Sequence, residues 1–396
     1  MTDAKLVITR YQEGVLSFVI NNNRMESVAF SRQSERGSIG DIYVAKVVNV
    51  VPHLNAAFID YMPGKKGFLP LDKYVPVLTN REYNGKLVAG DEVLVQLEKE
   101  AVRTKEPVFT LNLSLAGNYC VVTNADTKKG ISNKVAKKWK DALFEAVPKD
   151  IPYGIVVRTN AGRLAEENQL QAFADECKLL SDEMKQLLQN SRHRTCYSCV
   201  RKAASEYLAQ VCDNSHAEFS EIVTDDEDLF AELKAYLAAN MPQYLSMLRL
   251  YTDVSYSMQK LYGVETKLGE LLDKKVWMKS GAYLVIEQTE AMYVVDVNSG
   301  KNISGKENEE YIYKINLEAA TETMRQIRLR NLSGIIIVDF LNMKSQEKQE
   351  ALLRELRELA GQDKIYTNVV DMTPLGLVEI TRKKTKPILA QQLKAF

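Results

Sequence analysis

The chain has 396 residues, of which 45% are hydrophobic and 26% are charged, and its basic and acidic side chains balance to a net charge of zero. This is the composition of a folded protein of several domains, and it excludes a disordered chain. No apolar run approaches the roughly 20 residues of a membrane helix, and the N-terminus lacks the order of a signal peptide, so we expect a cytoplasmic protein without a membrane span.

Few residues are available for thiol or imidazole chemistry, since the chain has five cysteines and three histidines. Cys196 and Cys199 have the spacing of zinc ligands, but no second pair of ligands lies near them, and residues 196–211 read as a helix. We therefore expect buried or half-buried free thiols. No histidine occurs in the pattern of a triad or a zinc site, so any catalysis is expected to use carboxylates.

The first third of the chain is rich in short predicted strands. Residues 5–11 and 15–20 read as two strands that are too short to fold alone, and we expect segment 213–278 to complete their fold. From residue 37 the pattern changes to closely spaced strands, at 41–51, 56–61, 68–70, 92–97 and 108–115. Five strands with turn signals at this spacing predict a small OB-type barrel.

Two aromatic residues flank the glycine-rich turn of this predicted barrel, Phe58 before it and Phe68 after it. Basic residues are nearby at Lys65, Lys66, Lys99 and Lys105. Aromatic rings beside a basic groove bind single strands by stacking on their bases. The sequence is equally compatible with both rings lying in the barrel core.

The middle of the chain, residues 119–212, combines a lysine-rich helix at 133–146, a strand at 153–158 and two longer helical stretches. The strand ends in Arg158 and Thr159, followed by a predicted glycine turn at 160–162. A guanidinium and a hydroxyl in this position suit an anion such as a terminal phosphate. An arginine in an ordinary salt bridge is the alternative.

Two apolar strands in the last third each end in an aspartate. The strand at 292–296 ends in Asp296, a helix at 311–330 follows, and the strand at 334–339 ends in Asp339. Because ligand sites of open α/β sheets lie at the carboxyl ends of strands, we expect the two aspartates to converge, with Asn298 on the same side. Each aspartate alone reads more readily as a turn cap. Together with Asn298 they form an open set of hard oxygen ligands that suits Mg²⁺.

Several motifs occur in one order over almost the whole chain, and as an ordered set they resemble the ribonuclease E/G family. They are GFLP at 67–70, LSLAG at 113–117, VRT at 157–159, TEA at 289–291, DVNS at 296–299 and QIRLR at 326–330. The resemblance implies an α/β multidomain fold, in which an RNase H-like domain is split around an inserted OB barrel, with a 5′-sensor domain and a DNase I-like catalytic domain. The implied boundaries are 1–36 and 213–278 (RNase H-like), 37–118 (barrel), 119–212 (sensor) and 279–396 (catalytic).

The resemblance also implies an endoribonuclease that cuts single-stranded, A/U-rich RNA to 5′-phosphate products, in the maturation of ribosomal RNA precursors and in mRNA decay. By motif position, Asp296 and Asp339 resemble the two magnesium ligands and Asn298 their orienting partner. The positions of the barrel that bind RNA in the family correspond to Phe58, Phe68 and Lys105. The pocket for a 5′-monophosphate corresponds to Arg158, Thr159 and Arg382.

One feature of the family has no counterpart in this sequence. Relatives continue into a Cys-Pro-x-Cys zinc link, which joins two protomers, and then into a small tetramerising domain. We expect a short member without them, and thus a monomer or another dimer in place of the zinc-linked assembly. An RNA-binding protein of the same fold with weak or no catalysis is the alternative function, and the retained Asp296, Asn298 and Asp339 set argues against it.

Overall fold

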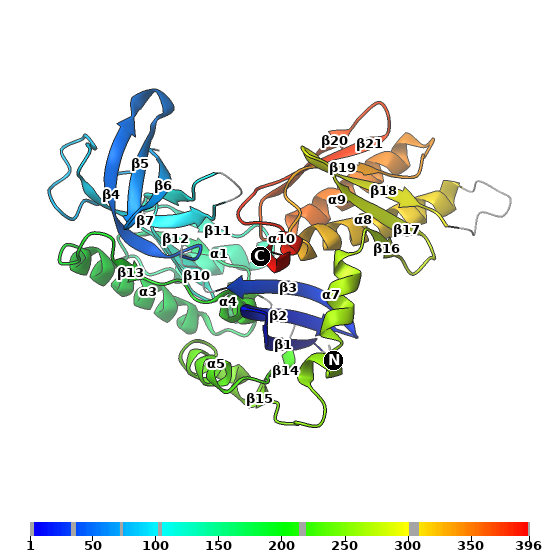
Figure 1. Cartoon of the computed structure of the whole chain (residues 1–396), viewed down its shortest axis with the longest axis horizontal. Coiled ribbons are helices and arrows are strands. Elements are labelled where there is room, and N and C mark those ends of the chain that lie inside the picture. Colours follow the sequence, from blue (N-terminus) through cyan, green and yellow to red (C-terminus); the bar gives the residue numbers. More distant parts are fainter. Residues whose placement is uncertain are drawn as a thin grey trace. The chain divides into compact units, whose positions relative to one another are not determined.

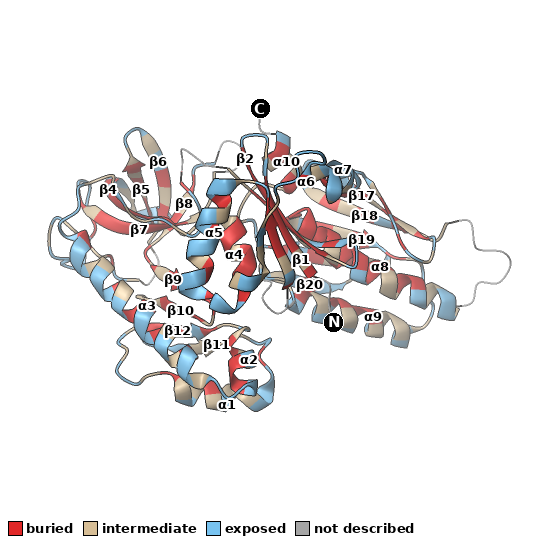
Figure 2. Cartoon of the chain, turned by 90° about the horizontal axis from the view of Figure 1, so that it is seen from below, coloured by how far each residue is buried: buried red, intermediate tan, exposed pale blue. Residues whose placement is uncertain are grey.

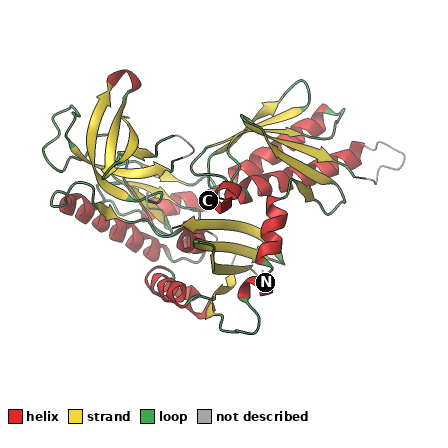
Figure 3. Cartoon of the chain, viewed as in Figure 1, coloured by secondary structure: helices red, strands yellow, loops and turns green. Residues whose placement is uncertain are grey.

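The structure is a computed structural model that describes residues 4–32, 37–71, 74–101, 105–213, 219–300 and 309–394. The chain divides into two compact units, one formed by residues 1–31 and 217–396 and the other by residues 32–216. Both combine helices with sheets (Figure 3), so the predicted α/β class is confirmed at this level. No helix within the described ranges is long and apolar enough to cross a bilayer.

The unit of residues 32–216 contains a closed five-stranded barrel, as predicted. Its strands are β4 (Ile42–Val51), β5 (Ala56–Met62), β6 (Lys65–Pro70), β7 (Glu92–Lys99) and β8 (Val108–Thr110). They pair in the order β4-β5-β6-β8-β7, and β7 pairs back to β4. Tyr43, Tyr61 and Phe109 fill the interior. A Cβ at Gly67 would lie 2.5 Å from the Phe109 ring, so this position of the barrel requires glycine.

A second sheet in the same unit follows the barrel in the chain. Its strands are β9 (Ser114–Ala116), β10 (Cys120–Thr123), β11 (Lys129–Ile131) and β12 (Gly154–Val157). The helices of the unit are α1 (Lys137–Ala146), α2 (Ala161–Glu166), α3 (Leu170–Ser191) and α4 (Glu206–Asp213). The helix predicted over residues 196–211 is partly wrong, because Cys199–Arg201 forms β13 on the edge of β4. All five cysteines are free, as expected, but Cys199 is exposed, so the expected burial is wrong for this thiol.

The other unit contains a five-stranded sheet in the order β15-β14-β1-β2-β3. Its strands are β1 (Ala4–Tyr11), β2 (Gly14–Asn21), β3 (Arg24–Arg32), β14 (Phe219–Thr224) and β15 (Leu248–Leu250), and its helices are α5 (Glu227–Asn240), α6 (Met258–Leu261), α7 (Val264–Leu272) and α10 (Leu389–Lys394). Because β1 pairs in parallel with β14, the prediction that segment 213–278 completes the N-terminal fold is confirmed. β15 is short because the preceding residues, Pro242–Met247, form a 3₁₀ helix.

The second sheet of this unit has six strands in the order β16-β17-β18-β19-β21-β20. They are β16 (Lys275–Trp277), β17 (Tyr283–Gln288), β18 (Met292–Asn298), β19 (Gly334–Asp339), β20 (Thr367–Met372) and β21 (Leu377–Arg382). The connecting helices are α8 (Glu309–Leu329) and α9 (Gln346–Gly361). Sequence reasoning missed β21, which lies between β19 and β20.

Helices α8 and α9 pack side by side against one face of this six-stranded sheet (Figure 1). Each helix has a buried side and an exposed side (Figure 2). Val295, Val297, Ile336 and Val338 point into the core beneath the helices. Successive strand residues alternate between faces, so their chain neighbours point to the opposite, open face. Ile335 on that face is 46% exposed.

Candidate active site

Asp296 and Asp339 lie side by side on the open face of the six-stranded sheet. Strands β18 and β19 are parallel neighbours joined through α8, and in their ladder Asp296 is the partner of Asp339. Both side chains are exposed, whereas Val295, Val297 and Val338 beside them are buried. The predicted convergence of the two carboxylates is thus confirmed, and it results from the register of the strands.

Asn298 fixes the orientation of one of these carboxylates. It lies two residues after Asp296 on β18 and therefore on the same face. Its side-chain Nδ2 donates a hydrogen bond of 2.7 Å to Asp296 Oδ2. This contact occupies one carboxylate oxygen and leaves Oδ1 for another partner.

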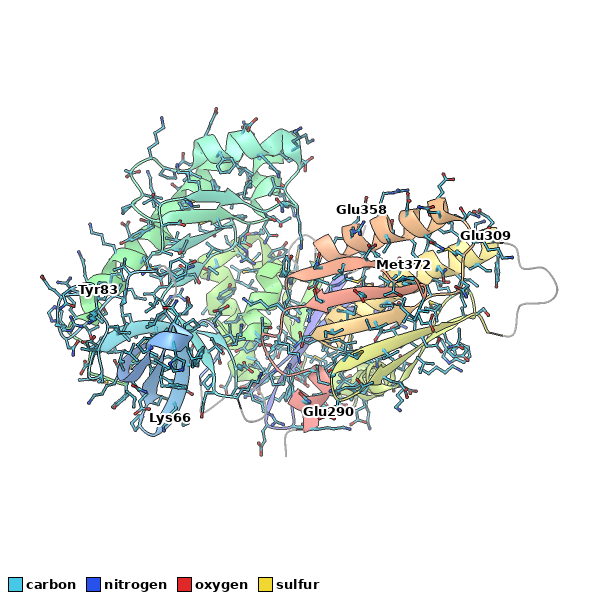
Figure 4. All side chains as sticks on the ribbon, turned by 90° about the horizontal axis from the view of Figure 1, so that it is seen from above. Lys66, Tyr83, Glu290, Glu309, Glu358 and Met372 are labelled. Atoms are coloured by element: carbon cyan, nitrogen blue, oxygen red, sulfur yellow. The ribbon has the colours of Figure 1, made fainter. Side chains whose placement is uncertain are left out.

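Figure 4 shows at which end of the strands Asp296 and Asp339 lie. It labels Glu290 in the turn between β17 and β18, at one end of the strands, and Met372 at the end of β20. Asp339 ends β19 at the Met372 end, since its partner Leu377 is next to Val378, the partner of Met372. The aspartates therefore lie at the carboxyl ends of β18 and β19, away from the Glu290 turn.

The chemistry of this donor set fits a magnesium ion. Two carboxylates and a nearby amide provide hard oxygen ligands, and they are too few to enclose a metal, so water and substrate phosphate would complete the shell. In the described ranges no group of three or more His, Cys, Asp or Glu side chains is placed to hold a metal.

Phe58 and Phe68 form a pair on the outside of the barrel. They are partners in the ladder of β5 and β6, with ring centroids 5.7 Å apart and planes inclined at 68°. Both rings are partly exposed, whereas Ala57, Ile59 and Leu69 on the other face fill the core. The alternative that both rings belong to the barrel core is therefore wrong.

Lys105, the third predicted RNA contact, is an exposed residue close to Phe68 along the barrel. It lies two residues before Pro107, whose carbonyl accepts a hydrogen bond of 2.9 Å from the backbone N of Phe68. Its contact with RNA stays a prediction.

Arg158 and Thr159 follow strand β12 in the unit of residues 32–216. The Arg158 guanidinium donates to the carbonyl of Gly117, within the LSLAG motif. The exposed Thr159 hydroxyl is 3.0 Å from the hydroxyl of Ser132, a neighbour that no sequence motif indicates. The glycine turn predicted after Thr159 is wrong, because Gly162 lies within α2.

Arg382 is buried, with 5% of its surface exposed, at the end of β21. Its Nε donates to Asp363 Oδ2 at 2.7 Å, and its Nη1 donates to Asn331 Oδ1 at 2.7 Å and to the Leu332 carbonyl at 3.0 Å. Burial acts to raise the pKa of Asp363, but the hydrogen bonds and charge of Arg382 hold it below its ordinary value. These contacts give Arg382 a structural role, because its guanidinium is bound by protein groups. The proposed contacts to a 5′-phosphate are therefore mainly Arg158 and Thr159.

We predict that Arg382→Ala lowers the free energy of unfolding by about 3–5 kcal/mol, because it leaves the Asp363 carboxylate buried without its partner. A carboxyl group whose pKa is lowered by folding stabilises the protein above its ordinary pKa, and this stabilisation is lost as the pH falls through the lower, folded value. Urea unfolding from pH 7 to pH 3 measures both effects. An unchanged unfolding midpoint at pH 7 would contradict the structural role.

A second buried polar network lies at the end of α8, within the QIRLR motif. Gln326 bridges Glu322 and Arg330 through hydrogen bonds of 2.8 and 2.7 Å. Arg24 of β3 forms an ion pair with Glu322, and burial lowers the pKa of Arg330 to about 10. The network ties α8 to the N-terminal strands, so this motif supports the position of the helix that joins β18 to β19.

The sequence profile of the ribonuclease E/G family matches residues 114–385, which is more than half of the chain. The chain belongs to this family. It is 30% identical to the ribonuclease G of Salmonella typhimurium over 93% of the chain and 77% of that protein. It is 31% identical to the ribonuclease G of Haemophilus influenzae, over 95% of the chain and 78% of that protein.

Ribonuclease E proteins are similar over a smaller share of their own length. The chain is 29% identical to the ribonuclease E of Escherichia coli over 98% of the chain but 37% of that protein. Membership of this family makes the chain an endoribonuclease of RNA processing and decay, with RNA as its substrate. A divalent metal cofactor is a general property of such a ribonuclease family.

Proposed function

We propose that the chain is a magnesium-dependent endoribonuclease that cuts single-stranded, A/U-rich RNA to 5′-phosphate products, in ribosomal RNA processing and mRNA decay. The observation that carries this proposal is the register of β18 and β19, which places Asp296 beside Asp339 on an open face. Both carboxylates are exposed there, as the binding of an extended phosphodiester requires.

Asp296 and Asp339 would hold the metal ion, and Asn298 would keep the Asp296 carboxylate in one orientation. When bound, a magnesium ion polarises a phosphoryl oxygen and lowers the pKa of a bound water. Phe58 and Phe68 would hold RNA bases by stacking, with Lys105 on the backbone. Arg158 and Thr159 would bind the terminal phosphate of the substrate.

We assign the parts of the chain to the family's domains by the same reasoning. We assign residues 37–118 to the RNA-binding barrel, 119–212 to the 5′-sensor, 1–36 with 213–278 to the split RNase H-like domain, and 279–396 to the DNase I-like catalytic domain. Two strands near these bounds pair across them: β9 (Ser114–Ala116) pairs with β10 of the sensor segment, and β16 (Lys275–Trp277) pairs with β17 of the catalytic segment. The pairing of β1 with β14 supports the split domain, and the single helix layer of α8 and α9 supports a catalytic domain with one open sheet face.

A cleavage-mapping experiment tests the proposed reaction. The purified protein is incubated in Mg²⁺ with a single-stranded RNA that contains one A/U-rich and one G/C-rich segment. We expect internal cuts in the A/U-rich segment, with 5′-phosphate ends that a 5′-phosphate-dependent exonuclease can degrade. Products with 5′-hydroxyl ends would contradict the proposed chemistry.

We predict that the enzyme cleaves 5′-monophosphorylated RNA faster than 5′-hydroxyl RNA, and that Arg158→Ala removes most of this preference. Charge-assisted hydrogen bonds to a phosphate contribute about 1.5–3 kcal/mol, so kcat/KM on the phosphorylated substrate should fall about 10-fold or more. Arg163→Ala is a matched control, since Arg163 forms an exposed ion pair with Glu167 and such pairs contribute little. Equal rates of the native enzyme on both substrates would remove the sensor from the mechanism.

A further inference from the structure

An aromatic pair lies on the outer strands of the sheet that carries the two aspartates. Trp277 ends β16 and Tyr283 begins β17, and the two residues are partners in an antiparallel ladder. Their ring centroids are 5.1 Å apart, with the planes inclined at 58°. Trp277 is 64% exposed, although tryptophan is highly buried on average.

Register places this pair on the same face as the predicted metal ligands. Tyr283 is the partner of Asn298, so Trp277, Tyr283 and Asn298 form one row across three strands. Residues in register on adjacent strands point to the same face. Two strand spacings, about 10 Å, separate Trp277 from β18. This is within reach of a nucleotide next to one bound at Asp296.

A lysine lies against both rings. Lys275 Nζ is 4.0 Å from the centroid of the Trp277 ring and 3.7 Å from that of the Tyr283 ring. Through Val285, Lys275 belongs to the adjacent row, which continues to Asp296 and Asp339. In the described part of the chain Lys275 forms no ion pair, whereas its neighbour Lys274 pairs with Glu287 at 2.8 Å. The positive charge of Lys275 is therefore not balanced by a nearby carboxylate.

The Trp277 and Tyr283 rings are not part of the hydrophobic core, although rings of this size could bury a large apolar area there. Val276 and Leu284, which lie next to them in the chain, belong to the buried core beneath α8. Trp277 and Tyr283 lie on the opposite side of the sheet from that core and pack on each other. An exposed aromatic surface with an adjacent cation is the combination that binds single-stranded nucleic acid by stacking and by phosphate contact.

We propose that Trp277 and Tyr283 form a stacking site for a base flanking the scissile phosphate, and that Lys275 contacts the neighbouring backbone phosphate. The site binds a nucleobase of single-stranded RNA. It provides an RNA contact on the six-stranded sheet of Asp296 and Asp339, in addition to the proposed contacts on the barrel. This inference rests on the proposed function, because it takes the row of Asp296 and Asp339 as the place of cleavage.

Tryptophan fluorescence tests the site without any cleavage. The chain has two tryptophans, so Trp139→Phe leaves Trp277 as the single tryptophan, and excitation at the red edge of tryptophan absorption selects it over the tyrosines. Titration with a single-stranded A/U oligonucleotide in EDTA should quench this emission, and the quenching should saturate together with binding followed by anisotropy of a labelled oligonucleotide. The native protein and Trp277→Phe both keep Trp139, so the difference between their quenching also gives the quenching of Trp277 by RNA. Unchanged Trp277 emission at saturating RNA would overturn the proposal.

Kinetics test the contribution to cleavage. Trp277→Ala should lower kcat/KM about 10-fold, mainly through KM, since one base stack is lost, and Trp277→Phe should restore most of it. Lys275→Gln should reduce the slope of log affinity against log salt by about 0.7, the value for one phosphate contact on a single strand. Lys274→Gln is the matched control and should leave this slope unchanged. Equal slopes for the native protein and Lys275→Gln, or an unchanged kcat/KM for Trp277→Ala, would overturn the assignment.

The two tests separate this site from the proposed reaction. If the native protein fails to cleave but Trp277 is still quenched, the reaction is wrong and the stacking site stands. If cleavage proceeds and Trp277 emission responds only to protein concentration, the aromatic pair is a protein–protein contact and the stacking site is wrong.

Discussion

Replacing Asp339 with asparagine is expected to slow cleavage of an A/U-rich oligonucleotide about 10³-fold, while the affinity for RNA changes less than about 3-fold. Asparagine keeps the shape of aspartate but removes the charge that holds a divalent ion. A metal ion stabilises the transition state by several kcal/mol, and about 4 kcal/mol corresponds to about 10³-fold in rate. Asp296→Asn is expected to have an effect of the same size, because the two residues are partners in one ladder.

Single-turnover cleavage and oligonucleotide binding, measured on the same preparations, give both quantities. Glu287→Gln is a matched control, since Glu287 is an exposed carboxylate of β17, forms an ion pair with Lys274 and is the ladder partner of Val294. It should cleave at the native rate. Native rates in both aspartate variants would place the chemistry elsewhere in the chain.

The second large effect is expected at the barrel, where Phe58→Ala or Phe68→Ala should weaken RNA binding about 10- to 100-fold. Each base stacked on an aromatic ring contributes about 1–3 kcal/mol, and both rings are partly exposed and in contact with each other. The cleavage rate at saturating RNA should change little, because neither residue belongs to the sheet that carries the aspartates.

Conservative variants separate stacking from packing at this pair. Phe58→Tyr keeps an aromatic face and should bind like the native protein, whereas Phe58→Leu keeps apolar bulk and should bind as weakly as Phe58→Ala. Thermal unfolding of each variant shows whether the barrel is intact. Native affinity in Phe58→Leu would mean that the ring serves the fold and not RNA.

The pairing of Asp296 with Asp339 could be predicted from the sequence because its signals are local. Gly334–Asp339 is an apolar run that ends in a charge, and α8 has a regular apolar period, so a crossover with an aspartate at each end follows from simple rules. The predicted helix 311–330 differs from α8 only at its ends.

Other features depend on contacts between distant residues. Strand β21 has only six residues and follows a short turn, and it owes its place next to the edge strand to pairing with β19 and β20. Without that strand, the burial of Arg382 against Asp363 has no sequence signal, and the basic residues after it suggest an exposed arginine instead. Similarly, β13 forms because Cys199–Arg201 pairs with β4, which overrides its helical pattern.

The orientation of Phe58 and Phe68 also depends on contacts between distant residues, so it could not be predicted from the sequence. Alternation in a strand separates two faces but does not say which one lies inside a barrel until the register of all strands is known. The structure decides it through Phe109, whose ring fills the space beside Gly67 and so marks the interior.

We propose that Asp296 and Asp339 together hold a metal ion that cleavage requires. The most direct test is the rate of single-turnover cleavage as a function of Mg²⁺ concentration, from EDTA to saturation, for the native enzyme and for Asp296→Asn. We predict a native rate that is negligible in EDTA and saturates with Mg²⁺, and a variant that stays about 10³-fold slower or needs far more Mg²⁺. Full native activity in EDTA, or superimposable magnesium curves for the two proteins, would contradict the account.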